Sequence, residues 1–211
     1  NQQRPPPVTV RVCDSVTCAL FGASDLIAAL NKSMGQDVRV QPVPCVGRCA
    51  DAPIAVVGHN PIEKASTKLV TEAVEQQALQ APPTNHLKYR EYCADGGYEL
   101  LRECHRRERD PADVIETLKD SNLRGLGGAG FPAGSKWSIQ RDQAAPRLIA
   151  VNIDEGEPGT FKDRYYLESE PHRFLEGVLI AAYIIKAHKV YIYIRDEYPV
   201  AVSYTHLTLP T

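Results

Sequence analysis

Short apolar runs alternate with amphipathic stretches over the first eighty residues. Val8 to Val12 is β-branched and predicts a strand, and residues 38–43 alternate polar and apolar positions as a second strand would. Ser24 or Asp25 is a suitable N-cap for a helix that carries its apolar residues on one face. The region is predicted to hold strands at 8–12, 38–43 and 55–57, helices at 24–33 and 63–79, and a turn at 59–61.

The hydrophobic pattern then predicts more helix than strand. Asp110 and Pro111 mark a helix start, since proline suits the first turn. Glu170-Pro171 breaks the chain. The predicted elements are helices at 91–107, 111–120 and 174–188 and strands at 147–152 and 190–195, with a glycine-rich segment at 123–137.

These elements predict an α/β protein with two folded regions. The order strand, helix, strand, strand, helix in residues 8–79 indicates a small α/β domain of thioredoxin-like type. Residues 80–88 read as a linker and residues 1–7 as a tail. Residues 89–200 form the second region, which is also α/β.

Composition narrows the class of protein. The 211 residues carry a net charge of -2, which gives no reason to expect nucleic acid or an anionic membrane as partner. The sequence contains no apolar run long enough for a transmembrane helix and no secretory h-region. The first residue is not Met, so we expect the start to be missing or processed. These features favour a cytoplasmic protein.

Four of the six cysteines form two close pairs. Cys13 and Cys18 are spaced C-x4-C, and Cys45 and Cys49 are spaced C-x3-C, each in a predicted loop just after a strand. Six cysteines are few for a disulfide scaffold, and without a secretory signal metal ligation is the better interpretation. Four thiolates suit a [2Fe–2S] cluster and also zinc, so spacing alone leaves both metals open.

The glycine-rich segment LRGLGGAGFPAGSKW spans residues 123–137. Its glycines leave the backbone free to pack against a flat ligand and to offer N–H groups to a phosphate. Gly125, Gly127 and Gly130 fit the G-x-G-x-x-G spacing, but a helix rather than a strand precedes them, so a classical dinucleotide fold is not predicted. Phe131 and Trp137 argue against a flexible linker.

A second polar motif, NIDEGEPGTFKDR, follows the apolar run 148–151. Carboxylates crowd a strand end at Asp154, Glu155 and Glu157. They could bind a metal, accept from a ribose or isoalloxazine N–H, or be solvated.

The first domain resembles the [2Fe–2S] domain of the small NADH-dehydrogenase subunit of complex I. The resemblance rests on C-x4-C, about 26 residues, then C-x3-C, and on the segment PCVGRCADAP at 44–53. It implies that the cluster is held by Cys13, Cys18, Cys45 and Cys49. Cys93 and Cys104 lie outside it and are expected to be ordinary residues.

The two later motifs together resemble the FMN-binding subunit of complex I and its soluble relatives. The second region would then be the N-terminal part of a complex I-type FMN-binding α/β domain. Leu126, PHRFLEG at 171–177 and YIYIRDEY at 191–198 look most like the beta subunit of NAD-dependent formate dehydrogenases.

Site residues follow from this resemblance by position. Phe131 is expected to stack on NADH, and Glu157 to meet the nicotinamide end as the catalytic residue. Ile139 stands where the family often has an aromatic residue, so the adenine contact is not carried over. The residues expected to bind the cofactors are Gly125, Gly127, Gly128, Gly130, Phe131, Lys136, Asn152, Asp154, Glu155 and Glu157.

The implied function is electron transfer between NAD(H) and iron–sulfur clusters through FMN, which can exchange both hydride and single electrons. The expected partners are a molybdenum or tungsten formate dehydrogenase subunit and a small [2Fe–2S] subunit. One alternative is the diaphorase subunit of an NAD(P)-linked hydrogenase or of a complex I-like enzyme. A non-enzymatic alternative is a zinc-stabilised binding module, which would have no use for the glycine motif.

Residues 201–211, AVSYTHLTLPT, match neither the family nor the preceding pattern. VSYTHLTLPT is what a transposase-based sequencing adapter would encode, so we expect this end to be an artefact. The family's C-terminal [4Fe–4S] domain would then be absent, and the chain alone would be inactive.

Overall fold

The computed structural model describes residues 6–198, which form two compact units. The described part of the first unit comprises residues 6–84, 154–165 and 194–198, and the second comprises residues 85–153 and 166–193. The first division, at Thr84, falls inside the segment expected as a linker. The first unit also includes the loop that follows the second strand motif.

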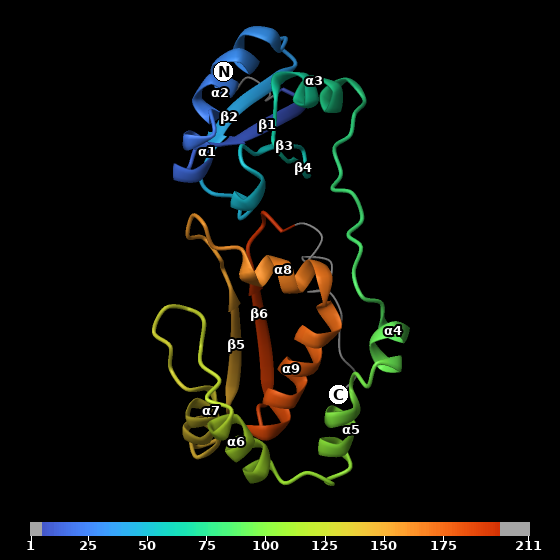
Figure 1. Ribbon diagram of the computed structural model, residues 1–211, viewed down its shortest axis with the longest axis vertical. Helices are drawn as coiled ribbons and strands as arrows, with labels where there is room; N and C mark the ends of the chain where they lie inside the picture. The colour runs from blue at the N-terminus through green and yellow to red at the C-terminus, as the bar shows by residue number, and fades with distance from the viewer. Residues whose placement is uncertain (1–5, 199–211) are drawn as a thin grey trace. The chain divides into compact units, whose positions relative to one another are not determined.

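A four-stranded sheet forms the centre of the first unit (Figure 1). Its strands are β1 (Val8–Cys13), β2 (Val38–Val43), β3 (Ala55–Val57) and β4 (Asn60–Ile62), in the order β2-β1-β3-β4. β1 runs parallel to β2 and antiparallel to β3. Side chains alternate between faces of a strand, and Val10 and Val12 point into the core together with Val57.

Helices α1 (Val16–Leu20), α2 (Ala23–Ser33) and α3 (Thr67–Glu75) complete this domain, with a 3-10 turn at Cys49–Asp51. α2 packs on β1 and β2, α3 packs on β3, and the two helices contact each other. The resulting core is the α/β arrangement that the pattern predicted.

Three local predictions in this unit were wrong. Residues 60–62 form β4 instead of a turn, because Gly58, with φ +63, reverses the chain earlier and lets β4 pair with β3. α3 consequently begins only at Thr67, after Ser66 accepts a hydrogen bond from the Leu69 amide. Gly22, in a left-handed conformation, precedes α2 in place of the expected serine or aspartate cap.

The second unit is mainly helical. Its elements are α4 (Tyr89–Ala94), α5 (Glu99–His105), α6 (Pro111–Asp120), α7 (Ala133–Arg141), β5 (Leu148–Ile153), α8 (Lys162–Ser169), α9 (Pro171–Ile184) and β6 (Lys189–Ile194), with α8 beginning in the first unit. β5 and β6 lie side by side, and α8 and α9 connect them (Figure 1). α9 packs against α5, α6 and α7 around Cys104, Ile115 and Ile184.

The long helix predicted at 91–107 is two helices. Gly96 and Tyr98 both adopt positive φ, which ends α4 and redirects the chain into α5. Gly97 has no room for a side chain because it packs against the Tyr92 ring. α9 begins at Pro171, three residues before the predicted start, because proline fits the first turn of a helix. α8 was not predicted.

Candidate functional site

The four paired cysteines lie in the first unit. Cys13 ends β1, Cys18 lies on α1, Cys45 follows β2, and Cys49 opens the 3-10 turn. Two of the four therefore lie in a helix or a helical turn rather than in open loops as predicted. Burial leaves Cys13, Cys18 and Cys45 almost no solvent contact, and the Cys45 and Cys49 sulfur atoms are 3.3 Å apart.

The two pairs influence each other electrostatically. Burial, followed by a hydrogen bond with Cys13, raises the pKa of Cys18 to about 12, and Cys49 adds to the rise. Burial likewise raises the pKa of Cys45 to about 11, with contributions from Cys49 and Cys13. Each pair therefore lies within the field of the other. Across residues 6–198, however, no three His, Cys, Asp or Glu side chains are grouped as metal ligands, so the four-cysteine ligand set stays a prediction.

Cys49 has a different environment. Burial works to raise the pKa of Cys49, but the Gly159 amide, Cys45 and the Thr17 hydroxyl outweigh it and bring the pKa below its ordinary value. The Gly159 nitrogen lies 3.2 Å from the Cys49 sulfur. The Gly47 amide similarly donates to the Cys45 sulfur over 3.4 Å. Buried thiols that receive amide hydrogen bonds suit a [2Fe–2S] cluster, whose sulfurs accept such bonds.

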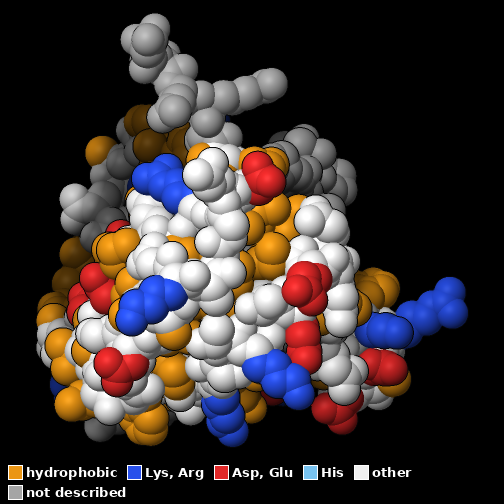
Figure 2. Space-filling view, turned by 90° about the horizontal axis from the view of Figure 1, so that it is seen from above, with side chains coloured by type: hydrophobic (Ala, Val, Ile, Leu, Met, Phe, Trp, Pro, Cys, Tyr) orange, Lys and Arg blue, Asp and Glu red, His pale blue; other side chains and the backbone are white. Residues whose placement is uncertain are grey.

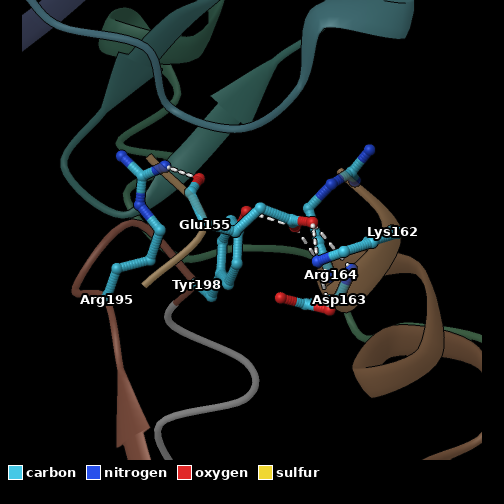
Figure 3. A network of polar contacts seen from close by, with 6 residues as sticks. All are labelled: Glu155, Lys162, Asp163, Arg164, Arg195 and Tyr198. Carbon is cyan, nitrogen blue, oxygen red and sulfur yellow. Dashed lines mark hydrogen bonds and ion pairs between the residues drawn. The ribbon is translucent and has the colours of Figure 1, made fainter. Parts of the chain in front are cut away.

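Glu155 lies at the centre of a polar network in the same unit (Figure 3). Its carboxylate accepts from the Asp163 amide at 2.9 Å and the Arg164 amide at 3.2 Å. The Tyr198 hydroxyl donates to it at 3.0 Å, and Lys162 forms an ion pair at 3.4 Å. Burial works to raise the pKa of Glu155, but these donors lower it overall, so the carboxylate is held in its charged form.

Arg195 joins this network to the second cysteine loop, residues 45–49. Its guanidinium donates to the backbone carbonyls of Glu155 and Cys45, and it also pairs with Glu197 at 3.0 Å. Arg195 is itself buried, so all three interactions occur away from bulk water. Figure 3 shows its side chain reaching the Glu155 backbone.

Tyr198 packs directly on the cysteine loop. A methyl group at Gly47 would collide with the Tyr198 ring and hydroxyl, and Gly47 also has φ +72. Only glycine suits both requirements. The tyrosine is 1% exposed, and burial followed by the charge of Glu155 raises its pKa.

The glycine-rich segment lies in the second unit, between α6 and α7. The Gly125 amide donates to the Phe131 carbonyl at 3.0 Å, and the Ala133 amide to the Leu123 carbonyl at 2.8 Å, so the segment forms a closed loop. At Gly127, Gly128 and Gly130 an added side chain would meet open space. Phe131 is 50% exposed, and Lys136 is exposed on α7. The loop thus presents glycine backbone and one aromatic ring to a ligand.

The carboxylate motif falls into two kinds of position. Asn152, Asp154 and Glu157 are exposed, as a ligand-binding role requires. Glu155 is 3% exposed, and its oxygens are occupied within the protein. Its expected role toward the cofactor stays a prediction, and the structure gives it a structural role that the sequence did not indicate.

Four residues of this site were missed: Thr17, Gly159, Arg195 and Tyr198. Arg195 and Tyr198 are about 150 residues from the cysteine loop, so no local spacing links them to it. The only signal was the unusual polar ending RDEY after an apolar strand.

A ferredoxin-like unit with paired buried thiols, joined to an α/β unit with an exposed glycine loop, defines an iron–sulfur flavoprotein. Residues 1–78 match the family described as thioredoxin-like [2Fe-2S] ferredoxin. Residues 118–209 match the family described as Nuo51 FMN-binding domain. The chain therefore combines these two domains, which confirms the predicted fold class and the two cofactors, [2Fe–2S] and FMN.

Curated relatives match about half of the chain. The second F subunit of NADH-quinone oxidoreductase from Rhizobium meliloti (strain 1021) is 48% identical over 121 residues, which are 57% of this chain and 28% of that protein. The F subunit of NADH-quinone oxidoreductase from Aquifex aeolicus (strain VF5) is 48% identical over 109 residues, 52% of this chain and 25% of that protein. The matched region is thus about a quarter of each relative.

Solved structures extend the similarity across both domains. The NAD+-reducing [NiFe]-hydrogenase in its air-oxidized state matches 97% of this chain and 40% of its own, with a TM-score of 0.76 and 26% identity. The H2-reduced state gives a TM-score of 0.77 and 27% identity, covering 97% of this chain and 39% of that chain.

The surface shows mixed charge. Figure 2 shows acidic and basic side chains interspersed with apolar ones on the face seen from above, in keeping with the net charge of -2. Among the helices in residues 6–198, none combines the length and apolar character that crossing a membrane would need.

Proposed function

We propose that this chain belongs to the electron-transfer subunit of an NAD(H)-linked oxidoreductase, which exchanges hydride at FMN and single electrons at a [2Fe–2S] cluster. The observation that carries the proposal is the presence of both domains in one chain, with the loop of the flavin motif donating a hydrogen bond to a paired cysteine. The names of the relatives, NADH-quinone oxidoreductase and NAD+-reducing hydrogenase, support NAD(H) as substrate.

Each group would have a defined set of residues. Cys13, Cys18, Cys45 and Cys49 would hold the cluster, since three are buried and Cys49 already receives an amide hydrogen bond. The open backbone at 125–130 would lie against the flavin, where a side chain would block a flat ring.

Lys136 would supply positive charge to the flavin side, and exposed Asn152 and Asp154 would hydrogen-bond it. Phe131 would stack on NAD(H), and Glu157 would bind its nicotinamide end. A flavin supplies the conversion between two-electron and one-electron transfer.

Two electron donors are proposed. Leu126, PHRFLEG and YIYIRDEY support formate, with a molybdenum or tungsten subunit as partner. The similarity to NAD+-reducing hydrogenase structures over 97% of the chain supports hydrogen at least equally. A complex purified with its native partners should reduce NAD with only one of the two, and activity with neither would reject both.

Cofactor analysis of the complete gene product containing this chain tests the general proposal. We expect a yellow-brown protein with flavin, iron and acid-labile sulfide, and NADH oxidation with an artificial acceptor. A colourless protein with stoichiometric zinc would instead establish the zinc-stabilised module.

A further inference from the structure

The second cysteine loop and the loop of the flavin motif are joined by buried polar contacts within the first unit. Arg195 donates to the backbone carbonyls of Cys45 and Glu155. Tyr198 packs on Gly47 and donates to the Glu155 carboxylate. We call Glu155, Arg195 and Tyr198 the clamp.

The clamp ends at a hydrogen bond to sulfur. Glu155 fixes its own loop through the amides of Asp163 and Arg164. Gly159 lies on the same loop, between these anchors, and its nitrogen is 3.2 Å from the Cys49 sulfur. Gly159 has φ +86, so the loop needs a glycine to present the amide in this way.

We infer that Glu155, Arg195 and Tyr198 are positioning residues that hold the Gly159 amide on Cys49, and that this hydrogen bond sets the reduction potential of the [2Fe–2S] cluster. The inference rests on the proposed function, because it requires Cys49 to be a cluster ligand. It assigns the buried part of the flavin motif to the iron–sulfur cluster rather than to the flavin.

The direction of the effect follows from charge. Adding an electron makes a cluster more negative, and hydrogen bonds to its sulfurs stabilise that charge. Without the Gly159 hydrogen bond the reduced cluster is less stable, so the potential becomes more negative. The loop that carries the exposed Glu157 also carries Gly159, so it contacts the iron–sulfur site while presenting a carboxylate toward nucleotide.

Glu155→Gln in the complete cofactor-loaded protein separates positioning from simple charge. Removing a negative charge near the cluster would by itself raise the potential, because the reduced state is repelled less. Loss of the clamp predicts the opposite, since the amide side chain cannot accept from both the Asp163 and Arg164 amides as the carboxylate does. The readout is an EPR-monitored redox titration of the cluster.

Glu157→Gln is the matched control, since it makes the same chemical change on an exposed position of the same loop. We expect a lower potential with an altered reduced-state EPR line shape for Glu155→Gln, and an unchanged or higher potential for Glu157→Gln. A potential that rises or stays the same in Glu155→Gln would overturn the inference.

Tyr198→Phe gives a second test without any change of charge at neutral pH. It removes the hydroxyl donor to Glu155 while keeping the ring on Gly47. We expect a smaller shift in the same negative direction, and this variant decides the matter if Glu155→Gln does not retain iron. Wild-type potential and line shape in Tyr198→Phe would then reject the clamp. Absence of a [2Fe–2S] signal from the wild-type protein would instead reject the proposed function.

Discussion

The second cysteine loop and the glycine loop are both built around glycine, but they use it in opposite ways. In the cysteine loop, Gly47 has no free space, because Tyr198 occupies it. In the glycine loop, Gly127 and Gly128 meet nothing within 4 Å of an added side chain. The first loop is filled by the protein, and the second is left open.

The hydrogen bonds of the two loops follow the same division. The cysteine loop is held from outside by Arg195 and by the Gly159 amide. The glycine loop is closed by its own backbone and by Arg124, which donates to the Gly130 carbonyl at 3.2 Å. A cluster is small and is bound through four atoms, so its ligands must be positioned by the protein. A flavin is broad and flat, so it requires an uncovered surface.

The largest effect is expected at a proposed cluster ligand. Cys45→Ser should abolish or alter the reduced-state [2Fe–2S] EPR signal and lower stability, because cluster binding is coupled to folding. Cys93→Ser is the control, since Cys93 lies on α4 in the second unit, beside Arg102. An unchanged signal in the Cys45 variant would exclude this cysteine as a ligand.

The open loop is tested by filling it. Gly127→Val should yield protein that has lost FMN but keeps its fold and its [2Fe–2S] cluster, because the new side chain enters space that no protein atom occupies. Gly177→Val on α9 is the control, since that glycine also has no neighbour within 4 Å but lies outside the loop. Normal flavin content in Gly127→Val would show that the loop does not touch FMN.

The filled loop makes the contrasting prediction. Gly47→Ala should reduce the free energy of unfolding by about 2–4 kcal/mol, because the methyl group collides with Tyr198 and the backbone conformation is unfavourable for alanine. Gly35→Ala, with open space and no positive φ, should change it by less than about 0.5 kcal/mol. Denaturant titration of the two variants compares them directly, and equal stabilities would contradict the described packing.

The sequence predicted the glycine loop more completely than the clamp. The loop's chemistry is contiguous, so its glycines, Phe131 and Lys136 could be identified together. The strands at 8–12, 38–43 and 55–57 were likewise recognisable from local alternation, and the structure confirms them within one residue.

The clamp depends on contacts that no local pattern encodes. Arg195 lies 150 residues from Cys45, and nothing in the pattern of YIYIRDEY distinguishes a buried bridging arginine from a solvated one. Three neighbouring acids also looked equivalent in the motif. Only the fold shows that Glu155 turns inward while Glu157 faces solvent.

The smallest predicted effect concerns this exposed acid. Glu157 offers a carboxylate that can hydrogen-bond the carboxamide or ribose of NADH, and its negative potential favours departure of hydride from the reduced flavin. Glu157→Gln should therefore retain FMN and lower kcat/KM for NADH oxidation by about 1–3 kcal/mol, the range for a lost charge-assisted hydrogen bond. Steady-state oxidation with an artificial acceptor measures this.

A merely solvated acid predicts a different result, a change within about 0.5 kcal/mol. Glu75→Gln is a suitable comparison, because it neutralises another exposed acid at the end of α3, outside both motif loops. Wild-type kcat/KM in Glu157→Gln would reject its role toward NADH. If instead kcat/KM falls while flavin content and cluster potential stay unchanged, the two acids have separate roles: Glu157 acts on the nucleotide, and Glu155 acts on the cysteine loop through the clamp.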